Sequence, residues 1–257
     1  MTHTISSVQQ NVYNSEHDPI VVEDVDENAV SLPLLRRLIN SAQGGIVGVA
    51  ATYRPDCTLS CLAFATHTRA LVVHFYAQKK PNPYQQQRKQ KKKGQEQQPP
   101  VFRGRPFLRD HILCNPGIQL YGYRMDRITL ALFLDLSLRI NAAIDILSVS
   151  NSDRRSFDAV MNALGGELLL QKQNVKTLYA HREVDETPAT KDVAIQAWAA
   201  CQAATLAHMT SRYAALSRIA TDTMPDVVCN LHLSQTYPRN LIHNVASECP
   251  GKDISRR

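Results

Sequence analysis

Two side chains of one predicted helix have the spacing of a functional site. Residues 193–203 read VAIQAWAACQA, in which Trp198 and Gln202 are four residues apart. Side chains with this spacing lie on the same face of an α-helix, so both would point toward the same space. The indole N–H of Trp198 donates a hydrogen bond but cannot accept a proton, and the neutral amide of Gln202 lacks the charge that Mg²⁺ requires. The pair is therefore not expected to bind a metal ion. A tryptophan on an alanine-rich helix face is more often a core aromatic residue than a site residue, and Gln202 could simply face solvent.

The carboxylates that could support metal chemistry lie in other segments. Asp126 begins an apolar helical pattern, where it could bind a cation or, as we prefer, cap the helix by accepting backbone N–H bonds. An acidic cluster precedes the first predicted helix; it could bind a cation, but we expect it to complement the positive end of the helix dipole. Its members are Glu23, Asp24, Asp26 and Glu27. Cysteine and histidine add no zinc site, because no C-x-x-C pair occurs and no histidine is spaced to complete one.

Strands and helices alternate along the chain in the order expected of an α/β domain with a mixed sheet flanked by helices. Apolar runs bounded by turn residues predict strands, and apolar residues three and four apart predict helices. The three strands between residues 45 and 75 are expected to form a meander. The predicted strands are residues 19–25, 45–52, 59–65, 70–75 and 118–121, with 143–149 a short strand or an extended segment. The predicted helices are residues 28–42, 107–114, 126–140, 156–164 and 191–219.

One folded domain is expected, with irregular segments at both ends and one in the middle. Residues 1–18 are polar and predict a flexible N-terminal tail. Residues 19–220 predict the folded domain, and residues 221–257 predict an irregular C-terminal extension. Within the domain, residues 78–100 are rich in glutamine, lysine and proline, a composition that cannot bury apolar surface and therefore predicts a disordered insert.

The basic charge of the chain belongs to that insert. The formal net charge is +6, and residues 78–100 hold seven basic residues and one acidic residue, so the remainder carries 22 of each sign. The seven are Lys79, Lys80, Arg88, Lys89, Lys91, Lys92 and Lys93. They could form a nuclear import signal, contact nucleic-acid phosphates by charge, or remain a solvated loop. A nucleic-acid contact is therefore predicted through the insert and not through the charge-neutral domain.

No segment predicts a membrane span or a secretory signal. The longest apolar run, residues 128–140, is interrupted by Asp135 and Arg139. The first residues contain no apolar stretch of the kind that signal peptides have. The six cysteines are expected to be reduced thiols, which together with the lysine-rich run predicts a nuclear or cytoplasmic protein.

Five segments, in their order and spacing, resemble the RNase D-like branch of the DEDD 3′–5′ exonucleases, which have an RNase H-like fold. They are IVVEDVDENAVSLPLLRRLINSA from residue 20, VGVAATY from residue 47, LSCLAFATHTRALVVHF from residue 59, FLRDHILCNPGIQLYGYRMDRITLALF from residue 107 and NAAIDILSV from residue 141. The helix around Trp198 resembles the last motif of that family, in which a Tyr or His precedes an Asp by four residues. The likeness extends over residues 20–216.

The resemblance implies an active site whose ligands this chain has largely lost. The family holds two divalent metal ions on four acidic residues, and its Tyr or His orients the attacking water. Carried over by position, the first acid is Ala50, the second is Thr52 and the last is Gln202, while Trp198 replaces the Tyr or His. Asp126 is the acid that the resemblance retains. These five positions are expected to meet in one pocket. In a different fold, Ala50 and Thr52 would be ordinary residues of a buried strand.

The preferred hypothesis is a non-catalytic exonuclease-like domain that serves RNA metabolism as a scaffold for protein, RNA or both. It implies no cofactor and no membrane contact. A protein partner comes first, because the domain is charge-neutral and residues 221–257 carry apolar side chains; RNA comes second, through the insert. The alternative is an active Mg²⁺-dependent 3′–5′ exonuclease on single-stranded RNA or DNA. That alternative predicts a tight cluster of at least three carboxylates, for example Asp126 and Asp145 joined by Asp24 or Asp26. It fails if no two of these acids lie within about 6 Å of each other.

Overall fold

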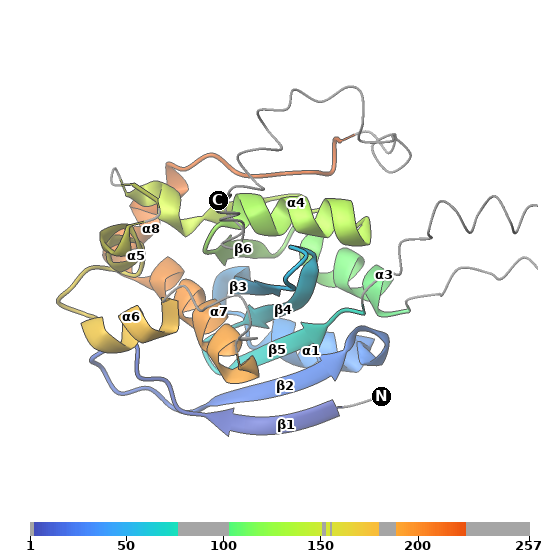
Figure 1. The fold of residues 1–257 in the computed structure, drawn as a ribbon, viewed down its shortest axis with the longest axis horizontal. Coiled ribbons are helices and arrows are strands. Elements are labelled where there is room, and N and C mark those ends of the chain that lie inside the picture. The colour runs from blue at the N-terminus through green and yellow to red at the C-terminus, as the bar shows by residue number, and fades with distance from the viewer. Residues whose placement is uncertain (1–2, 77–102, 151–152, 155, 180–188, 225–257) are drawn as a thin grey trace, which may run out of the picture.

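The computed structural model describes residues 3–76, 103–150, 153–154, 156–179 and 189–224 (Figure 1). The predicted basic insert, with its seven lysine and arginine residues, lies outside this described part of the chain, as does most of the predicted C-terminal extension.

A mixed sheet of seven strands forms the centre of the molecule, in the order β1-β2-β5-β4-β3-β6-β7. The strands are β1 (His3–Val8), β2 (Ile20–Asp26), β3 (Ile46–Tyr53), β4 (Leu59–Ala65), β5 (Arg69–His74), β6 (Gln119–Gly122) and β7 (Ala143–Asp145). The predicted antiparallel meander is confirmed as β3, β4 and β5. On one side of it β6 and β7 run parallel to β3; on the other side β2 runs parallel to β5, and β1 runs antiparallel to β2.

Helices cover both faces of the sheet (Figure 1). One face packs against α5 (Phe157–Ala163), α6 (Lys172–Tyr179), α7 (Thr190–Thr205) and α8 (Ala207–Ala214). The other packs against α1 (Leu32–Asn40), α3 (Gly104–Leu108) with the π-helical turn Arg109–Leu113, and α4 (Met125–Leu136). The prediction of an α/β fold with a mixed sheet flanked by helices is confirmed at this level.

The helix α7 packs unusually close to the sheet because small residues line both sides of the contact. Gly48, Ala50 and Ala63 face α7 from the strands, and alanines dominate the buried face of the helix. A methyl group built on Gly48 would overlap the carbonyl oxygen of Ala197. Side chains in protein interiors are close-packed, so this position tolerates only hydrogen.

The structure corrects the predicted extent of the last helix. Residues 191–219 were expected to form one helix, but α7 ends at Thr205 and α8 begins at Ala207. Leu206 between them has extended backbone angles, φ −65° and ψ 125°. The apolar periodicity continues through this break, which is why the sequence pattern does not reveal it.

The predicted flexible tail is wrong for residues 3–18. Residues 3–8 form β1, and Val12 and Tyr13 are buried at 0% and 4% exposure. The hydroxyl of Tyr13 donates to the carbonyl oxygens of Leu164 at 3.1 Å and Ala199 at 3.3 Å. The polar composition of this segment reflects an exposed edge strand followed by a strap that inserts only a few side chains into the core.

Three of the described cysteines, Cys61, Cys114 and Cys201, are free thiols, as the sequence predicts. Burial raises the pKa of Cys61 to about 11 and that of Cys201 to about 12, so neither free thiol is a reactive thiolate at neutral pH. None of the described helices has the length and apolar character needed to cross a membrane.

Candidate functional site

Two carboxylates meet where the parallel strands β3, β6 and β7 end, the edge at which open α/β sheets usually bind ligands. Asp145 is the last residue of β7, and Asp126 is the second residue of α4, which follows β6. Arg154 lies between them. Its Nη1 is 3.3 Å from Oδ2 of Asp126, and its Nη2 pairs with Oδ2 of Asp145. One guanidinium therefore bridges the two acids.

The two acids differ in their surroundings. The side chain of Asp126 is 56% exposed, whereas that of Asp145 is 3% exposed. Burial raises the pKa of Asp145, and the charge of Arg154 opposes that rise without cancelling it. The backbone N–H of Leu147 also donates to Oδ1 of Asp145 at 3.0 Å. Asp145 is thus a buried acid whose ionised form depends on Arg154.

Asp145 also holds the turn that positions Asp126. The backbone N–H of Arg124 hydrogen-bonds to the Asp145 carboxylate. Arg124 has left-handed backbone angles, φ 56° and ψ 48°, which are unfavourable for a residue with a side chain. The residue before this turn must be glycine, because a Cβ on Gly122 would lie only 2.7 Å from the carbonyl oxygen of Val49. The carboxylate of β7 therefore stabilises the strained start of α4.

Asp126 makes no contact that caps α4. Its Oδ1 accepts only the N–H of the next residue, Arg127, at 2.9 Å, and the N-terminal cap position of the helix belongs to Arg124. The capping role that the sequence favours is therefore not observed. Instead Asp126 contributes its second oxygen to Arg154.

Trp198 and Gln202 lie together, as their spacing predicts, but in a structural contact. Trp198 is fully buried, and its Nε1–H donates to the carbonyl oxygen of His67 at 2.9 Å. Nε2 of Gln202 is 2.8 Å from Nδ1 of the same histidine. The rings of Tyr13 and His17 meet the indole edge to face, with centroids 5.7 Å and 5.1 Å away. The pair fastens α7 to the turn between β4 and β5 and to the N-terminal strap.

Ala50 and Thr52 lie on the α7 side of β3. They are buried at 3% and 6% exposure, and Thr52 hydrogen-bonds with Cys61 on the neighbouring strand. Ala50 lies two residues beyond Gly48 on the same face of the strand, where a small side chain permits the close approach of the helix. Both behave as residues of a buried strand.

The five positions do not meet in one pocket. Cys201, next to Gln202, contacts the carbonyl oxygen of Ile46, so this part of α7 lies at the start of β3. Arg127, next to Asp126, stacks over the ring of Tyr53 at 4.0 Å, at the end of β3 and on the opposite face of the sheet. At about 3.3 Å per residue, the two ends are roughly 20 Å apart. The expectation of one shared pocket is therefore wrong.

The third acid that metal catalysis would need is also distant. Oδ1 of Asp24 lies 2.6 Å from Nε2 of His74, on β2 and β5. Five strand spacings separate β2 from β7, which is roughly 24 Å at about 4.8 Å per strand. Within the described residues, no group of three or more His, Cys, Asp or Glu side chains is placed to hold a metal ion.

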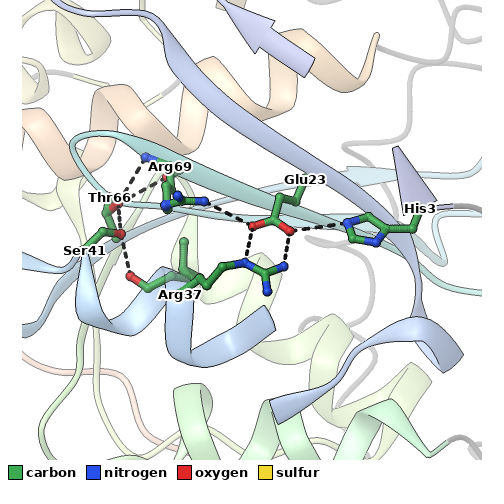
Figure 2. A network of polar contacts seen from close by, with 7 residues as sticks. His3, Glu23, Arg37, Ser41, Thr66 and Arg69 are labelled. Atoms are coloured by element: carbon green, nitrogen blue, oxygen red, sulfur yellow. Dashed lines mark hydrogen bonds and ion pairs between the residues drawn. The ribbon is translucent and has the colours of Figure 1, made fainter. Parts of the chain in front are cut away.

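Basic side chains contact two of the acids in the cluster before α1, Glu23 and Glu27. Figure 2 shows Glu23 receiving Arg37 and Arg69 together with His3. The Arg37 contact is bidentate, with its Nη2 2.6 Å from Oε2 of Glu23. Burial would raise the pKa of Glu23, but the hydrogen bonds and charges of these partners lower it below its usual value.

Glu27, in the same cluster, is fully buried and bound by two groups. Nε of Arg105 lies 2.7 Å from Oε2, and the backbone N–H of Tyr76 donates to Oε1 at 3.1 Å. Asp24 contacts His74, and Glu23 and Glu27 stabilise the fold through their ion pairs with arginine. A ligand role is not needed to explain them.

Sequence reasoning missed Arg154 and the structural role of Asp145. One signal for Asp145 is available, because an acid inside the apolar segment AIDILSV must be buried with a partner. The sequence carries no comparable signal for Arg154, which lies nine residues later in a connecting segment.

A scan of this chain against protein-family models finds no match, and a search of curated proteins finds no relative.

Proposed function

We propose that this chain is a non-catalytic member of the RNase H-like, 3′–5′ exonuclease-like class that serves RNA metabolism as a binding scaffold. A mixed sheet with helices on both faces is compatible with that class. The observation that carries the proposal is the guanidinium of Arg154 between Asp126 and Asp145. Trp198 and Gln202 lie at the other end of β3 and form a structural contact there.

The residues at this edge do not fit a pair of divalent ions. Such ions need several oxygen ligands each, and two neighbouring ions are normally held by several carboxylates. Here two carboxylates are available, and both already contact a fixed positive charge. A guanidinium supplies positive charge but stays protonated and cannot activate a water molecule. We therefore infer that the ion pairs at this site stabilise the fold and that its residues perform no catalytic step.

The second candidate function, an active Mg²⁺-dependent exonuclease, is favoured by one observation. Asp126 and Asp145 converge, as that hypothesis requires. Against it, Arg154 occupies the space between them and Asp24 is engaged elsewhere. A degradation assay on single-stranded RNA with Mg²⁺ separates the two functions.

We propose a protein as the first partner and RNA as the second, with the basic insert as the RNA contact. The chain outside residues 78–100 is charge-neutral, so phosphate binding would come from Lys79, Lys80, Arg88 and the lysines of residues 89–93. We also propose a nuclear or cytoplasmic location, on the basis of the lysine-rich run in residues 89–93.

Deletion of residues 78–100 tests the RNA contact. Each phosphate contact that is lost should flatten the dependence of affinity on salt, so the deleted chain should bind single-stranded RNA more weakly and with a smaller salt slope. Fluorescence anisotropy at several salt concentrations measures both quantities. A matched control replaces the seven basic residues with glutamine and keeps the length. Equal affinity for all three chains would refute the contact.

A further inference from the structure

The strand β1 is a sheet edge without the devices that normally keep two edges apart. It ends the sheet beside β2 (Figure 1), and no strand within the described residues pairs with its outer side. Edge strands are usually protected by lysine, proline, bulges or inward-pointing charges. The six residues HTISSV contain no lysine, arginine, acid, proline or glycine, and they pair with β2 without a register shift. Such an edge is a template for another strand.

One exposed apolar side chain lies in the middle of this edge. Ile5 is 65% exposed, and the residues on both sides of it, Thr4 and Ser6, carry hydroxyl groups. Ile5 pairs with Glu23 on β2. The carboxylate of Glu23 contacts two arginines and His3 (Figure 2). Through His3, this network ties β1 to β2.

We propose that β1 pairs with β1 of a second copy of this chain, antiparallel, around a two-fold axis beside Ile5. In an antiparallel ladder, facing residues both direct their backbone groups toward the partner or both direct them away. A strand can therefore pair with its own copy only when the two residues that face each other both have odd numbers or both have even numbers. The register that places Ile5 opposite Ile5 meets this condition. It also places Thr4 opposite Ser6 and His3 opposite Ser7.

This register is preferred over its neighbours because it covers Ile5 with an apolar partner. A shift of two residues in either direction would place Ile5 opposite His3 or Ser7. A pair of β-branched residues facing each other across strands is favourable, and no like charges face each other in the chosen register. A closed two-fold contact between identical patches is also the commonest form of protein self-association. The proposed dimer does not depend on the proposed function.

The dimer is expected to be reversible. Pairing over about five residues buries less than the roughly 1,200 Å² of a stable interface, so a dissociation constant in the micromolar range is expected. Sedimentation velocity of the full chain over a range of concentrations measures it.

Cysteine cross-linking tests the register. Directly facing Cα atoms in an antiparallel pair are about 4.5–5.5 Å apart, within the range that a disulfide spans. The variant Ile5→Cys should therefore form a covalent dimer rapidly under mild oxidation, read by intact mass under non-reducing conditions. The variant Ser7→Cys is the matched control, because residue 7 of one copy lies about 13 Å along the strand from residue 7 of the other. Equal cross-linking of both variants, or of neither, would overturn the proposal.

A charge substitution tests the contact without a cross-link. Ile5→Lys places two like charges at the two-fold axis and should weaken the dimer at least tenfold, with the fold retained because Ile5 is exposed. Leu168→Lys, at a residue 93% exposed between α5 and α6, should leave the dissociation constant unchanged. A wild-type chain that stays monomeric up to about 100 µM would overturn the proposal. So would a dimer that Ile5→Lys leaves intact, because its contact would lie elsewhere.

Discussion

At the scale of single residues, arginines pair with acids that could otherwise have bound a metal ion. Arg154 pairs with Asp145 and Asp126, and other arginines pair with Glu23 and Glu27 toward the opposite edge of the sheet. A buried carboxylate without a partner is strongly unfavourable, so each of these acids depends on its arginine. The carboxylates could be found in the sequence, but their partners could not, because each arginine belongs to another element or connecting segment and no sequence pattern links it to its acid.

Replacing Arg154 with methionine should destabilise the fold in a pH-dependent way. The pKa of Asp145 is already raised, so its ionisation costs stability as pH rises from the unfolded value near 3.8 through the folded value. Without Arg154 that pKa rises further, and the loss at pH 7 should be about 2 kcal/mol. The loss should shrink toward pH 4. Urea unfolding at both pH values measures it, and Arg154→Met combined with Asp145→Asn should recover stability at pH 7. A loss independent of pH would contradict this account.

Glu23 should show the opposite pH behaviour. Its pKa is lowered in the folded state, so its contribution is present above the unfolded value of 4.5 and is lost as pH falls through the folded value. Glu23→Gln should reduce the free energy of unfolding at pH 7 by about 2 kcal/mol. The difference from the wild-type chain should narrow on acidification below pH 4.5. Denaturant titrations of both chains check this, and a difference that stays constant down to pH 3 would refute it.

At the scale of elements, the close contact between α7 and β3 decides the roles of the motif-like residues. The sequence reveals the strands of the meander and the presence of a long alanine-rich helix, because both have clear periodicity. It does not reveal the register of helix on strand. That register places Trp198 beside the β4–β5 turn, far from Asp126. The sequence pattern therefore predicts that Trp198 and Gln202 share a helix face, but it does not predict which residues surround them.

The substitution Gly48→Ala tests this contact. The added methyl group overlaps the Ala197 carbonyl oxygen, so α7 must move away from the sheet, at a cost of about 1–3 kcal/mol. Gly117→Ala is the matched control, because its nearest neighbouring atom would be 3.4 Å away. Thermal unfolding of both variants gives the comparison. A Gly48→Ala chain as stable as the control would contradict the contact.

At the scale of the whole molecule, the two edges of the sheet differ. At one edge lie β7 and the acids bridged by Arg154, and at the other lies the unprotected strand β1. The sequence predicts the α/β class and most strands, but it assigns residues 3–18 to a tail. Polar, alternating residues are typical both of a disordered tail and of an edge strand, and only pairing with β2 distinguishes them.

The most direct test of the non-catalytic proposal is a degradation assay with 3′- and 5′-labelled single-stranded RNA in the presence of Mg²⁺ or Mn²⁺. We expect no shortening above the level of a chain in which Asp126 and Asp145 are both replaced by asparagine. Progressive 3′–5′ shortening that requires the metal ion, and that disappears in the Asp126→Asn chain, would contradict the proposal.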